Sequence, residues 1–213
     1  MSAAMLVRRW SRDHGFGAQW VLLSFLLLLA ALSAGPVLAA EGDPAGRATI
    51  TLGTVEAIAA DGTVRRLGRQ DPVFEGDTLR TGPRGRAQIR FTDRGLLSLR
   101  PDTEVAIDDY EFDAATPATG RQELNVTRGG FRAATGRIAD ANRDAWRVRS
   151  PLAVIGVRGT IFDLFQQPSG PLTLGVSRGG IVAVTSSGNA RRSWGTGPAS
   201  TTRGSGPTEP WPT

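Results

Sequence analysis

The sequence contains no cysteine and no lysine, and its only histidine is His14. Disulfide frameworks, thiolate-ligated metal sites and Schiff-base chemistry are therefore excluded, and beyond residue 14 so are imidazole catalysis and imidazole metal sites. Carboxylates are the side chains that remain for catalysis or metal binding. These absences predict a protein that is not an enzyme and that uses no cofactor and no metal.

The charge of the chain is less unusual than its isoelectric point of about 11.1 suggests. All 25 basic residues are arginine, against 20 acidic residues, and beyond residue 40 the chain still carries 22 arginines against 19 acids. The high isoelectric point thus reflects arginine in place of lysine more than a strong positive field. The sequence gives little support to nucleic-acid binding, and no nucleic-acid partner is predicted.

Residues 1–40 have the layout of a secretory signal peptide. Three arginines precede the apolar run Trp20–Leu32, and a Gly-Pro pair then leads to small residues that end at Ala40. An uncleaved anchor is the alternative, because the apolar segment nearly reaches the roughly 20 residues that a bilayer span needs. Either way the chain from Glu41 onward lies outside the cytoplasmic membrane. The sequence predicts a periplasmic protein, or an inner-membrane protein with a single N-terminal anchor, that contacts the membrane only through this leader.

Residues 48–190 form the predicted folded domain. In Ala87–Thr92 apolar and polar residues alternate one by one, and similar short runs recur about every ten residues between Gly, Pro and Asp turn signals. Alternation with a period of two is typical of strands that have one buried face. The fold class predicted is all-β, a compact roll or solenoid or a sandwich of short strands.

Three segments interrupt or repeat this pattern. Residues 191–213 are rich in Gly, Pro, Ser and Thr and are predicted to be an unfolded tail. The Ala-rich segment 133–145 could hold a short helical turn or an exposed loop. The strings Arg128-Gly129-Gly130 and Arg178-Gly179-Gly180 sit in similar surroundings fifty residues apart, and they predict two similar corners between strands.

Acidic residues cluster at 108–113. Strand alternation would place Asp109, Glu111 and Asp113 on one face, opposite Tyr110 and Phe112. Three carboxylates on one face could hold Ca²⁺. The spacing is not that of a calcium loop, and the cluster is better explained as a solvated face that also protects a strand edge by charge repulsion.

A second notable string runs from Val154 to Asp163. Gly156 and Gly159 allow a tight corner or a close approach of the backbone. Arg158 could be a buried staple that binds a carboxylate or carbonyl groups, or it could contact a ligand. A phosphate-binding loop is not expected, because the string lacks a strand-to-helix transition.

Several strings together resemble the FecR domain family, the extracytoplasmic module of iron-responsive regulators of sigma factors. The similar segments are Gly53–Val55, Val73–Gly82 with Gly76 and Asp77, Ala87–Phe91, the turn at 100–103, Ser150–Phe162 with Gly156, Gly159 and Thr160, and Gly175–Ile181. The chain departs from the family at Asp93-Arg94-Gly95, where members usually have Asp-Gly and then a small residue. The resemblance implies an all-β fold and a structural role for the glycines, Asp77 and Thr160 of these strings.

Regulators of this family also have a cytoplasmic anti-sigma segment, one membrane span and a further domain after the FecR module. At most about 19 residues precede the apolar run here. We therefore expect a stand-alone exported FecR-domain protein.

The function predicted is that of a non-enzymatic binding or scaffolding module for an envelope protein or polymer whose identity is unknown. Strand edges would supply main-chain hydrogen bonds, and Arg84, Arg86 and Arg90, with Arg158 as a further candidate, would supply selectivity. The alternative is a membrane-anchored component of signal transduction that is linked to metal or siderophore uptake and sigma factor regulation.

Overall fold

The computed structural model describes residues 42–185, 190–194 and 197–202, so the predicted leader lies outside the described residues. Its regular elements are strands except for one short α-helix and one 3₁₀ turn, which confirms the all-β prediction. The elements are β1 (Gly46–Leu52), β2 (Val55–Ile58), β3 (Val64–Arg66), β4 (Pro72–Val73), β5 (Thr78–Thr81), β6 (Arg86–Phe91), β7 (Leu96–Leu99), β8 (Glu104–Glu111), η1 (Pro117–Thr119), β9 (Arg121–Ala134), α2 (Arg137–Ala141), β10 (Trp146–Arg149), β11 (Ala153–Gln166), β12 (Leu172–Thr185), β13 (Ala190–Trp194) and β14 (Gly197–Thr202).

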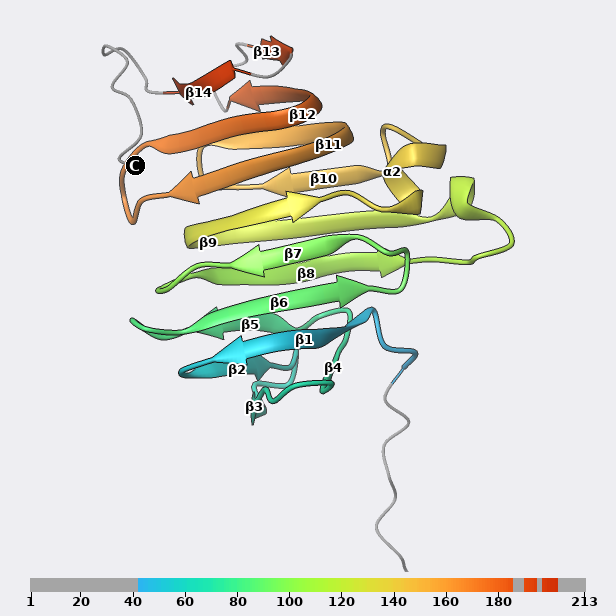
Figure 1. The fold of residues 1–213 in the computed structure, drawn as a ribbon, viewed down its shortest axis with the longest axis vertical. Helices are drawn as coiled ribbons and strands as arrows, with labels where there is room; N and C mark the ends of the chain where they lie inside the picture. Colours follow the sequence, from blue (N-terminus) through green and yellow to red (C-terminus); the bar gives the residue numbers. More distant parts are fainter. Residues whose placement is uncertain (1–41, 186–189, 195–196, 203–213) are drawn as a thin grey trace, which may run out of the picture. The chain divides into compact units, whose positions relative to one another are not determined.

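The strands form two facing layers within one hydrogen-bonded network. One layer, called the front layer, begins with β4, β1, β6 and β7, and the other, called the back layer, begins with β3, β2, β5 and β8. Figure 1 shows β1, β6 and β7 in front of β2, β5 and β8. The chain passes between these layers through short turns. In both layers alternate side chains point into the space between them, as the period of two requires.

Three strands of 14 residues each, β9, β11 and β12, belong to both layers. The first half of β9 pairs with β8 and β10 in the back layer, and its second half pairs with β7 and β11 in the front layer. β11 likewise pairs with β10 before it crosses and with β9 afterwards. The sequence predicted short strands. In β9, β11 and β12 two such strands are joined into one long strand, because the chain bends at the crossing without forming a loop.

Each of these strands bends at a glycine. Gly129, Gly159 and Gly179 have φ angles of 80°, 57° and 84°, a conformation that residues with a Cβ rarely adopt. At Gly129 an added Cβ would lie 2.5 Å from the carbonyl oxygen of Asp102. The two Arg-Gly-Gly strings therefore mark corners, as predicted, and Arg158-Gly159-Thr160 is a third.

The core between the layers is apolar and contains an aromatic cluster. Trp146 of the back layer lies edge-on to Phe162 of the front layer, with ring centroids 5.7 Å apart, and Phe162 also contacts Phe131 at 5.9 Å. All three side chains are buried. Such edge-to-face pairs add to the stabilisation from burial, which fastens the two layers together.

The segments outside the main pattern have defined places. The helix α2 lies in the segment that was predicted to hold a helical turn or a loop. The predicted tail differs from the structure, because β13 and β14 pair with the two halves of β12 between residues 190 and 202. Main-chain pairing needs no apolar side chain, so composition alone did not reveal it. Residues 203–213 lie outside the described residues.

Within the described residues, no helix has the length and apolar character that a membrane crossing requires.

Candidate functional site

The outer face of the back layer carries charges that neutralise one another. One cross-strand row reads Arg66, Glu56, Arg80, Glu104 and Arg128, so that basic and acidic side chains alternate over β3, β2, β5, β8 and β9. Glu104 accepts ion pairs from both of its neighbours in this row, at 3.3 Å each. This face presents little net charge to a partner.

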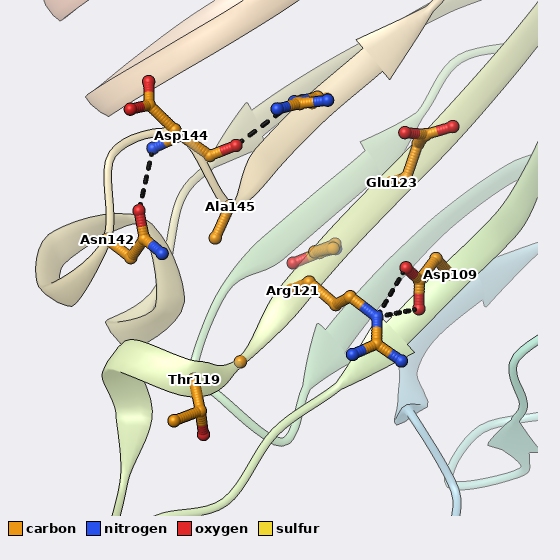
Figure 2. Close-up of a pocket in the computed structure, with 10 residues that line it drawn as sticks. Asp109, Thr119, Arg121, Glu123, Asn142, Asp144 and Ala145 are labelled. Carbon is orange, nitrogen blue, oxygen red and sulfur yellow. Dashed lines mark hydrogen bonds and ion pairs between the residues drawn. The ribbon is translucent and has the colours of Figure 1, made fainter.

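A second part of the same face forms a pocket of about 380 Å³ beside α2 and η1. Figure 2 shows Arg121 pointing toward Asp109, and its Nε lies 2.7 Å from the nearer carboxylate oxygen. Arg121 also pairs with Glu111, and Arg149 pairs with Glu123. The hydrogen bond and the charge of Asp109 raise the pKa of the Arg121 guanidinium. The lining of this pocket carries three acidic residues against two arginines.

This arrangement bears on the predicted acidic face. Asp109 and Glu111 are held by one arginine, and Asp113 lies after β8, where it accepts hydrogen bonds from Ala115 and Thr116. No group of three or more potential metal-ligating side chains exists among the residues that the structure describes. β5 pairs with β8 only at Glu104–Ala106, whereas Asp109–Glu111 pair with β9 alone, so protection of a strand edge by this acidic segment stays a prediction.

The outer face of the front layer has a different charge pattern. Within the front-layer strands up to Val176, the only acidic residue is Asp163 of β11. The arginines on this face are the exposed Arg47 of β1, Arg86 and Arg90 of β6 and Arg132 of β9, and the partly buried Arg100, which directly follows β7. Alternation along β6 explains why Arg86 and Arg90 both point outward while Ala87, Ile89 and Phe91 fill the core.

A groove of about 380 Å³ crosses this face from β1 toward β11. Its polar residues follow the cross-strand register, in which Gln88 lies opposite Ser98, Ser98 opposite Arg132, and Arg132 opposite Asp163. Arg86 and Arg100 lie along one side, and Ile50 and Leu52 close the end at β1. We refer to this groove as the arginine groove.

Asp163 is the anion of the arginine groove and lies at its far end. Its carboxylate binds Arg132 through two guanidinium nitrogens, the shorter contact being 2.7 Å, and it also accepts Arg100 at 3.3 Å. The hydrogen bonds and charge of Asp163 raise the pKa of Arg132. One carboxylate thus balances two guanidinium groups. Within residues 42–185, 190–194 and 197–202 neither Arg86 nor Arg90 takes part in an ion pair.

The structure places the four predicted binding residues at separate points. Arg86 lines the arginine groove, Arg90 lies on the same face further along β6, and Arg84 is exposed in the turn before β6. Arg158 pairs through its backbone with Gly180 at a corner, and its side chain lies outside the described part of the structure. Only Arg86 of these four lines the groove.

The predicted structural residues lie at turns and corners, with one exception. Gly76 has a φ of 83°, and buried Asp77 accepts the Phe74 N–H at 2.9 Å and pairs with Arg65 at 2.6 Å. Thr160 is buried beside the corner at Gly159. Gly156, in contrast, lies in regular pairing, and an added Cβ would meet only the Val182 oxygen, at 3.9 Å.

Sequence reasoning missed Arg100, Arg132 and Asp163. Arg100 and Asp163 are 63 residues apart, and Arg132 and Asp163 are 31 apart, so no local motif connects them. A signal was present, because Arg132 and Asp163 each stand at a polar position between apolar residues of a strand.

A buried carboxyl lies at the turn between β6 and β7. Asp93 accepts the N–H of Gly95 at 2.8 Å and that of Ile138 at 3.5 Å, which links the turn to α2. Desolvation raises the pKa of Asp93, against the effect of these hydrogen bonds. Burial likewise raises the pKa of the neighbouring Tyr110 to about 12. These groups hold the turn in place and face no pocket described above.

Comparison with known proteins finds a family model that matches part of the chain. Residues 77–182 match the family model described as FecR protein. This stretch runs from the end of the β4–β5 turn into β12, so it includes β9, β11, most of β12 and most of the arginine groove. No curated protein matches the chain.

Two kinds of solved structure are similar to parts of the chain. One is described as a cell surface anchoring domain, with 32% identity over 30% of this chain and 83% of that chain, and a TM-score of 0.29. The other is a proposed anti-sigma factor from Parabacteroides distasonis ATCC 8503, solved twice, with 14% identity over 55% of this chain and a TM-score of 0.42. The similarity spans half of that protein's length.

Proposed function

Because the chain contains a FecR domain at residues 77–182, we propose that it is a non-enzymatic FecR-domain protein of the cell envelope, exported to the periplasm, that binds an acidic protein or polymer. The outer face of the front layer is the binding surface. The observation that supports this proposal is the difference in charge between the two outer faces.

Charge complementarity gives the front layer its selectivity. Several arginines of the back layer bind acids of neighbouring strands, such as Arg80 and Arg128 with Glu104 and Arg149 with Glu123. On the front layer Arg86 and Arg90 have no such partner within the described residues, and their guanidinium groups can bind a carboxylate or phosphate with two hydrogen bonds each. An acidic partner is therefore attracted to one face of the domain.

The absence of catalytic side chains supports a binding role over an enzymatic one. Beyond residue 14 the chain has no cysteine, histidine or lysine. Most carboxylates of the pocket in Figure 2 are held by arginines, and Asp163 is held by two of them. Carboxylate oxygens that already accept hydrogen bonds from a guanidinium group are less available to take a proton from a substrate.

The binding role is tested by capture from envelope extract. The exported protein is compared with the double variant Arg86→Gln/Arg90→Gln and with the control Arg80→Gln/Arg128→Gln, which removes the same charge from the back layer. We expect the first variant to lose partners that the wild type and the control retain. Equal capture by all three proteins would contradict the assignment of the face.

Export is tested separately. Leu27→Arg places a charge in the apolar run at a cost of about 2.5 to 3.5 kcal/mol on insertion scales, so the variant should remain in the cytoplasmic fraction. Mass spectrometry of the N-terminus then distinguishes the alternative role. A start at Ala40 or Glu41 supports the exported protein, whereas an intact leader supports a membrane-anchored component of signal transduction.

A further inference from the structure

The arginine groove offers basic groups on three neighbouring strands. Three adjacent strands each supply one guanidinium to it, Arg86 from β6, Arg100 from the end of β7 and Arg132 from β9. Arg86 and Arg100 follow each other across β6 and β7, which lie about 4.8 Å apart as neighbouring strands, whereas Arg132 lies opposite Ser98, two residues further along. The interval between neighbouring strands is close to the length of one pyranose unit along a glycan chain.

The groove also carries neutral hydrogen-bonding groups beside the arginines. Gln88 and Ser98 lie opposite each other on β6 and β7, with Gln88 Nε2 3.4 Å from Ser98 Oγ. Amide and hydroxyl groups of this kind can bond sugar hydroxyls, while guanidinium groups bind carboxylates. Ile50 and Leu52, 49% and 58% exposed, present an apolar surface at the end of the groove, against which the C–H face of a sugar ring can pack.

We propose that the arginine groove binds an acidic polysaccharide, a polymer of sugars that bear carboxylates, which lies across β6, β7 and β9 with its anionic groups on Arg86, Arg100 and Arg132. This inference rests on the proposed function and names the class of its acidic partner. The polymer runs across the strands, so successive sugars meet successive strands.

The composition of the face favours a polysaccharide over a folded protein. Protein interfaces are enriched in aromatic residues and Met at their centre. None of the large exposed hydrophobic residues in the described part of the chain is aromatic, and only Ile50 and Leu52 among them line this groove. The surface therefore has abundant charge and few anchors of the kind that a protein partner uses.

Asp163 sets the strength of the site. Its carboxylate forms ion pairs with Arg100 and Arg132, the two arginines nearest the β11 end of the groove. A polymer carboxylate has to compete with it or share these donors. Replacing Asp163 by Asn removes this competing charge and should strengthen polyanion binding, whereas the loss of Arg86 should weaken it.

The test measures binding of the exported protein to polygalacturonate, with dextran as the neutral control. We expect Kd to rise about tenfold for Arg86→Gln. Asp163→Asn should bind several-fold more tightly, and Arg80→Gln on the back layer should match the wild type. Binding should weaken when the salt concentration rises from about 0.05 to about 0.5 M, because salt screens exposed charges. Thermal melts check that each variant is folded.

Two further probes separate this inference from the proposed function. If poly-L-glutamate or vesicles of anionic phospholipid bind at least as tightly and respond to Arg86→Gln in the same way, the polysaccharide is the wrong class, but the acidic-partner function stands. If no polyanion binds while envelope capture still depends on Arg86, the inference fails alone. If neither polyanion binding nor capture depends on Arg86, both proposals fail.

Discussion

The hydroxyl of Thr160 donates a hydrogen bond to the carbonyl oxygen of Gly180 at 2.9 Å and accepts the N–H of the same residue at 3.2 Å. Thr103 makes the same pair of bonds with Gly130, at 2.9 Å each. In both cases the partner follows a glycine of positive φ, where the strand turns. At each corner a threonine hydroxyl thus binds both the N–H and the carbonyl of a buried glycine.

Replacement of Thr160 by Val should destabilise the domain, because the isosteric side chain leaves the buried Gly180 groups without this partner. Each unsatisfied group costs about 1 to 3 kcal/mol. Urea unfolding measures the change, and Thr160→Ser, which keeps the hydroxyl, should recover most of it. A Val variant as stable as the Ser variant would show that the hydroxyl contributes nothing.

Gly129→Ala and Gly156→Ala form a matched pair on two crossing strands. At Gly129 the φ of 80° and the backbone oxygen 2.5 Å from a Cβ predict a loss of about 3 kcal/mol or more. At Gly156 nothing lies closer than 3.9 Å, so alanine should change the free energy of unfolding by less than about 1 kcal/mol. Equal effects at the two sites would contradict the corner geometry.

Asp93 should give the domain an unusual dependence on pH. Burial raises its pKa in the folded state above the unfolded value of 3.8, so the folded protein holds the proton more tightly. The contribution of Asp93 to stability is then fully present below pH 3.8 and is lost as the pH rises through the folded pKa. Unfolding of the wild type and of Asp93→Asn should be measured from pH 3 upward in steps. The wild type should lose stability relative to the variant as the pH rises, and parallel curves would contradict this.

Arg158→Ala tests the two interpretations that the sequence left open. If the guanidinium is a structural staple, its loss should cost about 1 to 3 kcal/mol for each group left unpaired, and the variant should melt earlier. Arg178, exposed at the adjacent corner, is the control, and its replacement should stay within about 0.5 kcal/mol. We expect the structural outcome. Unchanged melting with reduced capture of a partner would instead place Arg158 in the binding site.

Alternation of apolar and polar residues predicted the fold class and the outward direction of Arg86 and Arg90, because both follow from the geometry of a single strand. The groove could not be predicted in the same way. Arg100, Arg132 and Asp163 meet only because β9 and β11 cross from one layer to the other before they pair. The pairing of the first half of β8 with β5 likewise depends on topology, which the pattern of a single strand does not reveal.

The turn at Arg94, between β6 and β7, shows a second limit of prediction from the sequence. This residue has a φ of 74°, a conformation for which glycine is the usual choice, at the position where the sequence departs from the family pattern. The surrounding turn is fixed by Asp93, whose carboxylate accepts the N–H of Gly95. A residue-by-residue comparison flags the departure, but it does not reveal that the neighbouring carboxylate holds the turn.

The two halves of the domain are joined in different ways. Up to β8 the chain changes layer only through turns, at Gly53 or Gly82 for example, whereas from β9 onward it crosses three times as continuous strand. A loop can yield without disturbing the ladders beside it, but bending a crossing strand breaks pairing in both layers at once. Thermal opening should therefore start among β1 to β4 and then spread toward β9, the first strand that pairs in both layers. The last amides to exchange with solvent should be those of β9 and β11.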